Sequence, residues 1–93
     1  MQDKKWYCYI LECNDKTFYT GVTTDIDRRL KEHNDNYKGR GAKYTKTRRP
    51  LRLVYLSGYF NTRSEVMQTE SQIKKLTRQQ KISLIEGQSN RHF

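Results

Sequence analysis

Two tyrosines, Tyr9 and Tyr19, stand on either side of a short polar break near the start of the chain. A tyrosine hydroxyl has a pKa of about 10, so it transfers protons at neutral pH only where neighbours lower that pKa or accept the proton. The pair is therefore either two ordinary strand aromatics or two hydroxyls directed at one point, where they could do acid–base chemistry.

A histidine and an arginine break the amphipathic pattern of the segment 24–34, which has helical spacing. Ile26 and Leu30 define its apolar side. His33 lies within about 40° of their mean direction and Arg29 within about 80°, whereas Arg28 points away. Arg29 and His33 are also four residues apart, so their side chains can reach one site. The alternative is a snorkelling arginine beside a core histidine whose hydrogen bonds are satisfied.

Glu70 lies within the apolar side of a second helical segment, between Val66 and Ile73. A carboxylate in that position is unfavourable unless it is paired or binds a cation. A salt bridge with an arginine is one explanation. A metal or substrate site is the other, because carboxylate oxygens are hard ligands that suit Mg²⁺ or Mn²⁺.

These side chains must be positioned by a small sheet and its helices. Thr24 or Asp25 can cap the first helix, and Thr62 with Glu65 forms a capping box for the second. The pattern predicts strands over 6–13, 17–23 and 51–60, helices over 24–34, 62–76 and 78–86, and a long loop over 35–50. The order β-β-α-β-α-α indicates an α+β fold, a three-stranded sheet flanked by helices, in a single domain over 1–93 with a core of about 6–86 and a frayed tail over 87–93.

The turn between the first two strands decides whether the tyrosines share a face. A three-residue loop pairs Tyr9 with Gly21 and makes Tyr9 and Tyr19 diagonal neighbours, whereas a four-residue loop places them on opposite faces. The shorter loop needs Lys16 in a left-handed conformation, at a cost of roughly 1 kcal/mol. Gly21 opposite Tyr9 would leave space over the ring, which suits a ligand approaching there.

The charge balance favours a polyanionic partner. Nineteen Lys and Arg residues against ten Asp and Glu give a net charge of +9, which fits nucleic acid better than a surface kept basic for solubility alone. Cys8 and Cys13 are too far apart along one strand to form a disulfide, which indicates reduced thiols and a cytoplasmic protein. No apolar run approaches the length of a membrane span, so no membrane partner is expected.

The long loop supplies a candidate nucleic-acid surface. Its basic residues have an aromatic among them and no acid between 38 and 49. The charges can follow phosphates and the ring can stack on a base, which suits a flexible strand; the alternative is a solvated loop. The candidate binding residues are Lys38, Arg40, Lys43, Tyr44, Lys46, Arg48 and Arg49.

The motifs "YCY" (7–9) and "YTG" (19–21), together with Arg29, His33 and Glu70, resemble the GIY-YIG endonuclease superfamily. The segments "GRGAKYT" and "RRPLRLVY" are similar to its small stand-alone bacterial members, and the chain also resembles the nuclease domain of eukaryotic structure-selective junction nucleases. The resemblance covers roughly residues 6–85. Tyr7 and Cys8 replace the glycine and isoleucine of the first motif, and Thr20 replaces the isoleucine of the second.

The resemblance implies a metal-dependent endonuclease. Glu70 would hold one divalent cation, Mg²⁺ or Mn²⁺, and Arg29 would stabilise charge on the phosphate. Tyr9 is the preferred general base; Tyr19 is the other candidate, and Tyr19 and His33 would orient the water and the base. The substrate would be nucleic acid, with DNA favoured over RNA, single-stranded or branched character and weak sequence preference. A module that binds nucleic acid without cleaving it is the alternative function, and a monomer is favoured.

Overall fold

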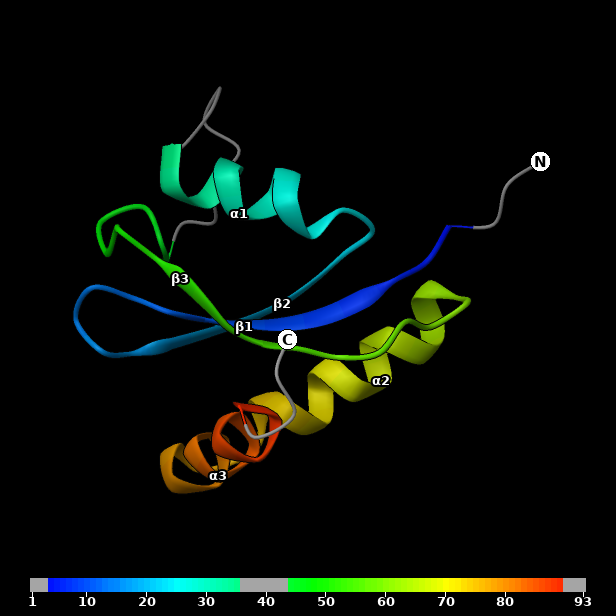
Figure 1. Cartoon of the computed structure of the whole chain (residues 1–93). Helices are drawn as coiled ribbons and strands as arrows, with labels where there is room; N and C mark the ends of the chain where they lie inside the picture. Colours follow the sequence, from blue (N-terminus) through cyan, green and yellow to red (C-terminus); the bar gives the residue numbers. More distant parts are fainter. Residues whose placement is uncertain (1–3, 36–43, 90–93) are drawn as a thin grey trace.

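The computed structural model describes residues 4–35 and 44–89, and this part of the chain forms a three-stranded sheet with helices on both faces (Figure 1). The α+β class and the element order expected from the sequence are confirmed. The elements are β1 (Tyr7–Glu12), β2 (Phe18–Thr23), α1 (Ile26–Asp35), β3 (Arg52–Leu56), α2 (Arg63–Lys74) and α3 (Arg78–Ser89).

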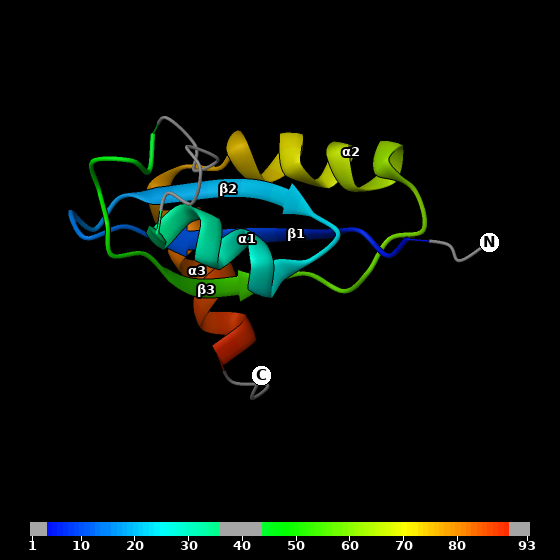
Figure 2. The same cartoon turned by 90° about the horizontal axis from the view of Figure 1, so that it is seen from above.

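β1 is the central strand, since the sheet order is β2-β1-β3 and both pairings are antiparallel. α1 covers one face of the sheet, whereas α2 and α3 cover the other (Figure 1). Seen from above, β2 is the outer strand on the side of α2 (Figure 2). β1 is therefore buried on both faces, and its residues from Cys8 to Leu11 are at most 1% exposed.

Alternation along β1 divides the core into two clusters. Cys8 and Ile10 pack with Val66 and Ile73 on the α2 side, whereas Tyr9 and Leu11 belong to the cluster on the α1 side. Successive side chains of β1 thus serve opposite layers, and Tyr9 is directed toward α1.

Both cysteines are free and buried, as expected. Burial and, to a smaller extent, the nearby negative charge of Glu70 together raise the pKa of the Cys8 thiol to about 11. The protonated thiol is not a nucleophile at neutral pH.

The hairpin has the register that places the two tyrosines on one face. Tyr9 pairs with Gly21, and Cys13 N donates to Thr17 O at 2.8 Å. Lys16 adopts a φ of 69°, the left-handed conformation that the three-residue loop requires. Its carbonyl accepts a hydrogen bond from Arg78 Nη1 at 2.8 Å, which fastens the turn to α3.

Polar residues cap the N-termini of α1 and α2. Asp25, rather than Thr24, caps α1, because its Oδ1 accepts from Arg28 N at 3.1 Å. At α2, Thr62 Oγ1 accepts from Glu65 N at 3.2 Å and its hydroxyl donates to the Glu65 carboxylate at 2.9 Å.

Two boundaries differ from the sequence prediction by more than two residues. β3 ends at Leu56 rather than Phe60, and an isolated pairing of Trp6 with Phe60 lies beyond it. α3 continues through Gly87 to Ser89, so the tail does not fray at 87. The reason is that the Gln88 side chain bonds both the amide and the carbonyl of Leu56, at 2.8 and 2.6 Å, which anchors the last turn to β3.

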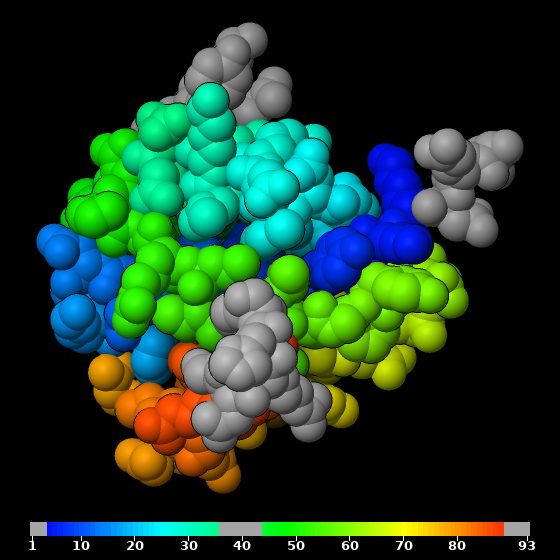
Figure 3. Space-filling view, in the orientation of Figure 1, coloured from blue at the N-terminus to red at the C-terminus, as the bar shows by residue number. Residues whose placement is uncertain are grey.

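The chain from β3 into α2 lies between α1 and the orange-red α3 (Figure 3). Within residues 4–35 and 44–89, none of the helices has the length and apolar character needed to cross a membrane.

Candidate active site

Tyr9, Tyr19 and His33 meet on the α1 side of the sheet. The Tyr9 hydroxyl lies 3.0 Å from His33 Nε2. The ring centroids are 6.4 Å apart for the two tyrosines, 6.0 Å for Tyr9 and His33, and 5.1 Å for Tyr19 and His33. Residues from two strands and a helix thus form one compact group.

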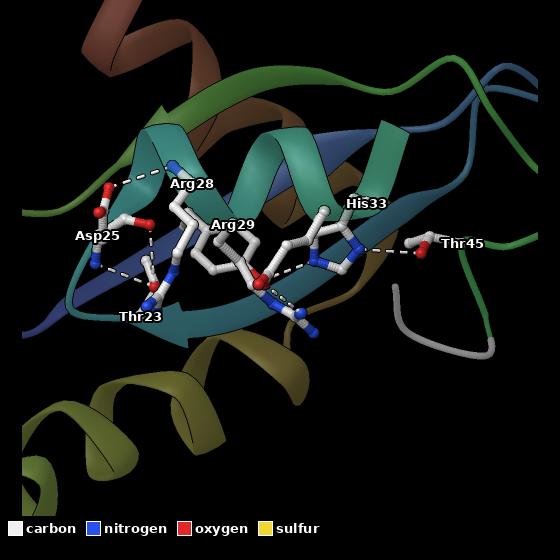
Figure 4. Close-up of polar contacts among 8 residues, drawn as sticks. Thr23, Asp25, Arg28, Arg29, His33 and Thr45 are labelled. Carbon is white, nitrogen blue, oxygen red and sulfur yellow. Dashed lines mark hydrogen bonds and ion pairs between the residues drawn. The ribbon is translucent and has the colours of Figure 1, made fainter. Parts of the chain in front are cut away.

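His33 is held at both ring nitrogens. Its Nδ1 lies 2.9 Å from Thr45 Oγ1, opposite the contact with Tyr9, and His33 and Thr45 are both fully buried. Figure 4 shows the His33 ring between Thr45 on one side and Arg29 on the other. The sequence pattern identified His33 but missed Thr45, because a threonine in a basic loop has no periodicity that marks it as buried.

His33 is neutral at neutral pH. Burial and, to a smaller extent, the positive charge of Arg29 lower its pKa to about 4, although Glu32 partly opposes the shift. A neutral imidazole donates at one ring nitrogen and accepts at the other. The contacts with Tyr9 and Thr45 fit that state.

The lowered pKa of His33 makes stability depend on pH in a defined window. Between about pH 6.5 and pH 4 the unfolded chain binds a proton at this position and the folded chain does not, so stability falls as the pH falls. The expected loss of unfolding free energy across that window is about 3 kcal/mol. Urea unfolding at pH 7, 5.5 and 4 measures it.

The His33→Gln variant is the control for this measurement, because carboxylates also titrate in the same window. The variant is expected to lose less stability than the wild type between pH 7 and pH 4. Equal losses in the two proteins would contradict a histidine that is buried in its neutral form.

Tyr9 is protonated in the protein alone. Burial raises the pKa of its hydroxyl above the ordinary value, and the charges of Tyr19 and Glu70 add to the shift, although a hydrogen bond and the positive charge of Arg29 oppose it. Two routes were expected from the sequence: a pKa lowered by the basic surroundings, or a proton shared with a neighbour. The 3.0 Å contact with His33 favours the second route.

Arg29 is oriented by Glu32, an acid that the sequence pattern did not identify as part of the site. Its Nη1 donates to Glu32 Oε1 at 3.0 Å, and the exposed fractions of the two side chains are 23% and 11%. The i, i+3 spacing could have revealed this pair. Arg29 therefore borders the packed face, as predicted, while Arg28 is exposed.

Glu70 approaches the group from α2, on the other side of the sheet. Glu70 is 9% exposed, and Lys74 Nζ lies 3.6 Å from its Oε1. Lys74 is largely exposed, so this ion pair offsets little of the free-energy cost of burying the Glu70 carboxylate. Because the charge of Glu70 raises the pKa of both Tyr9 and Cys8, the carboxylate acts electrostatically on the site.

A single carboxylate can suffice for a magnesium site. In the described part of the chain, no three His, Cys, Asp or Glu side chains gather closely enough to hold a metal ion by themselves. Mg²⁺, however, usually keeps several waters and binds through one or two carboxylates plus substrate phosphates. The single carboxylate of Glu70 is compatible with that mode.

Gly21 gives Tyr9 the room it occupies, so the tyrosine ring itself fills the space that was expected to receive a ligand. A Cβ atom at Gly21 would lie 2.5 Å from the Tyr9 hydroxyl oxygen, 2.7 Å from its Cζ and 3.1 Å from Cε2 of Tyr19. Contacts below 3.0 Å force a shift. Tyr9 is 1% exposed, so its ring has little freedom to move aside.

Gly21→Ala is expected to displace the Tyr9 hydroxyl from His33. Overpacking of this kind typically costs about 1–3 kcal/mol of unfolding free energy. Urea unfolding and the Tyr9 environment in NMR spectra measure the two effects. Gly58→Ala is the matched control, because no atom lies within 4 Å of a Cβ there; equal effects of the two substitutions would contradict the close approach.

The described part of the basic loop is tied to the fold. The Tyr44 ring stacks on Tyr19 with centroids 6.2 Å apart, and the Arg48 guanidinium lies 4.1 Å from the Tyr44 centroid. Arg48 also pairs with Asp15 at 3.0 Å. These contacts bring Tyr44 beside the site, although the pattern had placed it only in a nucleic-acid surface. Of the candidate binding residues, Lys38, Arg40 and Lys43 lie outside the described residues.

Arg49 also makes structural contacts. Its Nε donates to Lys46 O and its Nη1 to Asn34 O, both at 3.1 Å, which joins the loop to the last turn of α1. Arg49 and Lys46 line a hollow of about 510 Å³, which does not include the tyrosines or Glu70. Arg48 and Arg49 thus position the loop in addition to carrying charge.

Comparison with known proteins identifies the domain. Residues 5–83 match the family model described as the GIY-YIG catalytic domain. A UPF0213 protein of Syntrophus aciditrophicus is 51% identical over 87 residues, 94% of this chain and 97% of that protein. The UPF0213 protein YazA of Bacillus subtilis is 43% identical over 90 residues, 97% of this chain and 87% of its own.

Two solved structures share the fold. The solution NMR structure of a UPF0213 protein from Bacillus halodurans has 46% identity and a TM-score of 0.55, covering 88% of this chain and 83% of that one. The solution NMR structure of a protein from E. faecalis has 40% identity and a TM-score of 0.61, covering 100% and 96%. These matches confirm the resemblance and the fold expected from the sequence.

Proposed function

The chain belongs to the GIY-YIG family, a family of nucleases, and we propose that it is a metal-dependent endonuclease that hydrolyses phosphodiester bonds in nucleic acid. The observation that carries the proposal is the chain of contacts from Tyr9 through His33 to Thr45, with distances of 3.0 and 2.9 Å. Packing alone needs no hydroxyl bonded to a neutral imidazole whose other nitrogen is also engaged. A tyrosine that acts as a general base does need an acceptor for its own hydroxyl proton.

Tyr9 serves as the general base through His33. As the attacking water gives a proton to the Tyr9 oxygen, the Tyr9 hydroxyl proton passes to Nε2 of His33, and Nδ1–H of His33 donates to Thr45. This route avoids a free phenolate, which the raised pKa of Tyr9 makes unfavourable. Tyr19, 5.1 Å from His33 between ring centroids, orients the water.

The charged residues stabilise the phosphate. Arg29, oriented by Glu32, meets negative charge that develops on the phosphoryl oxygens. Glu70 holds one divalent cation, Mg²⁺ or Mn²⁺, which when bound supplies a Lewis acid for the phosphate and charge stabilisation for the leaving 3′-oxygen. The basic, aromatic loop carries the substrate strand toward this site.

Thr45 acts as a positioning residue, because it contacts His33 rather than the substrate. Thr45→Val keeps the shape and removes the hydroxyl, so we expect kcat to fall about tenfold with little change in KM, while Thr45→Ser restores most of the rate. Steady-state kinetics of the two variants measure this split. A Thr45→Ser rate as low as that of Thr45→Val would contradict the role of the hydroxyl.

The proposed function is tested by cleavage of labelled single-stranded, duplex and branched DNA, and of matching RNA. Each substrate is incubated with Mg²⁺, Mn²⁺ or EDTA. We expect cleavage of DNA with single-stranded or branched character, with weak sequence preference, only when a divalent cation is present. Tight binding without cleavage of any substrate would favour a nucleic-acid-binding module instead, and cleavage in EDTA would contradict metal dependence.

A further inference from the structure

A pocket of about 240 Å³ lies at the edge of the sheet beside the proposed active site. Its walls come from the start of β2, the loop before β3, the end of α2 and the first turn of α3. The lining residues are Phe18, Tyr19, Thr20, Tyr44, Lys74 and Lys81. β2 is an edge strand, so the pocket opens at a place where the sheet has no further strand.

Thr20, a residue of this wall, carries an unpartnered hydroxyl. Thr20 is 5% exposed, and its buried Oγ1 has no hydrogen-bond partner among the described residues. Leaving a buried polar group unsatisfied is unfavourable. The motif position that carries isoleucine in the family carries this threonine here, so the chain accepts that cost at a residue that lines a pocket.

The other walls suit a planar ring beside phosphates. The aromatic rings of Phe18 and Tyr44 are held in place by Arg78 at 4.9 Å and Arg48 at 4.1 Å from their centroids. Lys74 and Lys81 are the charged residues of the described lining, which holds no carboxylate. The volume is below the roughly 300–1,000 Å³ typical of pockets for drug-sized ligands, so a single small ring system fits better than an extended one.

The pocket is continuous with the catalytic group. Tyr19 belongs to both, and Lys74 lies 3.6 Å from Glu70. A strand whose phosphate reaches Glu70 and Arg29 therefore has an adjacent nucleotide within reach of the pocket.

We propose that this pocket binds one unpaired base of the substrate strand, next to the phosphodiester that is cleaved. Rotation of the Thr20 side chain brings Oγ1 to the edge of the base, where it forms a hydrogen bond; Phe18 and Tyr44 contact the ring, and Lys74 and Lys81 neutralise the flanking phosphates. The inference rests on the proposed function. A base inside a duplex is stacked and paired, so the pocket selects single-stranded, bulged or branched substrates. A hydroxyl both donates and accepts, so it discriminates weakly among bases.

The test measures binding in EDTA, where no cleavage is expected. The probes are a labelled short DNA duplex with one unpaired 2-aminopurine, the same duplex with an abasic site at that position, and the fully paired duplex. We expect the wild type to bind the base-bearing bulge about tenfold tighter than the abasic one, with a change in 2-aminopurine fluorescence. Equal affinities for the two bulges would overturn the proposal.

Two variants locate the effect. Thr20→Val and, independently, Phe18→Leu are expected to reduce the tenfold preference to about threefold or less. Thr20→Val removes an unsatisfied hydroxyl, so it should unfold at an equal or higher urea concentration than the wild type. A preference that survives in both variants would place the base elsewhere and overturn the assignment.

Lys81→Gln tests the phosphate contact. It is expected to reduce the slope of log Kd against log salt concentration by about 0.7–0.9, the value for one phosphate contact. Lys5→Gln removes the same charge from the opposite end of the sheet, where Tyr7 pairs with Thr23, and should leave the slope unchanged. Equal slopes for Lys81→Gln and the wild type would remove Lys81 from the site.

Failure of the pocket and failure of the proposed function give different results. If no substrate is cleaved but the base preference persists, the endonuclease is wrong and the pocket stands as a nucleotide-binding site. If single strands are cleaved without any base preference, the pocket is wrong and the endonuclease stands.

Discussion

Glu70→Gln is expected to lower cleavage by at least about 10³-fold, because the charge that holds the divalent cation is lost while the side chain keeps its size. Binding of single-stranded DNA in EDTA should remain within about threefold of the wild type, since a negative charge contributes nothing to attraction of a polyanion. Single-turnover cleavage with Mg²⁺ and anisotropy in EDTA measure the two quantities.

The stability of this variant separates a metal site from a structural salt bridge. Lys74 lies 3.6 Å away and is largely exposed, so its pair with Glu70 contributes little, and the unfolding free energy should change by less than about 1 kcal/mol. Glu86→Gln removes an exposed carboxylate from α3 and is the matched control, with full activity expected. Full activity of Glu70→Gln would exclude Glu70 as the metal ligand.

Tyr9→Phe is expected to lower kcat by about 10²–10⁴-fold, the range supplied by a general base. The substitution keeps the ring that packs on Leu11 and removes only the hydroxyl that contacts His33. It leaves Nε2 of His33 unpaired in a buried position, so the unfolding free energy should fall by about 1–3 kcal/mol while the protein stays folded at room temperature. Stopped assays at saturating substrate and urea unfolding measure both.

Two comparisons make the result specific to Tyr9. Tyr55→Phe removes a hydroxyl from β3 on the α2 side of the sheet, and its cleavage rate should equal that of the wild type. Tyr19→Phe decides between the two candidate bases: it should reduce cleavage less than Tyr9→Phe, because His33 contacts the hydroxyl of Tyr9. A wild-type rate for Tyr9→Phe with a much lower rate for Tyr19→Phe would reverse the assignment.

Much of the fold could be predicted from local spacing, because the physical rules for turns and for strand alternation act over a few residues. The sequence left two loop lengths open, and the structure has the three-residue loop ending at Lys16, whose register places Tyr9 and Tyr19 on one face. The element order was predictable. The ends of β3 and α3 were not, since they depend on the contact between Gln88 and Leu56, residues that are far apart in sequence.

The residues proposed for the site were visible in sequence as departures from a packing pattern, and the +9 charge pointed to a polyanion. A pattern gives the direction of a side chain, however, and neither its partner nor its protonation state. That His33 contacts the hydroxyl of Tyr9 and is fixed by Thr45 follows only from the fold.

The sequence by itself determined the α+β fold and the departures at Arg29, His33 and Glu70, and it left the face of the tyrosines open between two loop lengths. Only the tertiary structure decided that Tyr9 and Tyr19 share a face, that the pKa of Tyr9 is raised and that of His33 lowered, and that the hydroxyl of Thr20 is buried without a partner among the described residues. The physical reason is that a pKa shift and an unpaired buried group both depend on burial and on charges from segments that are distant in sequence. These exist only once the chain has folded.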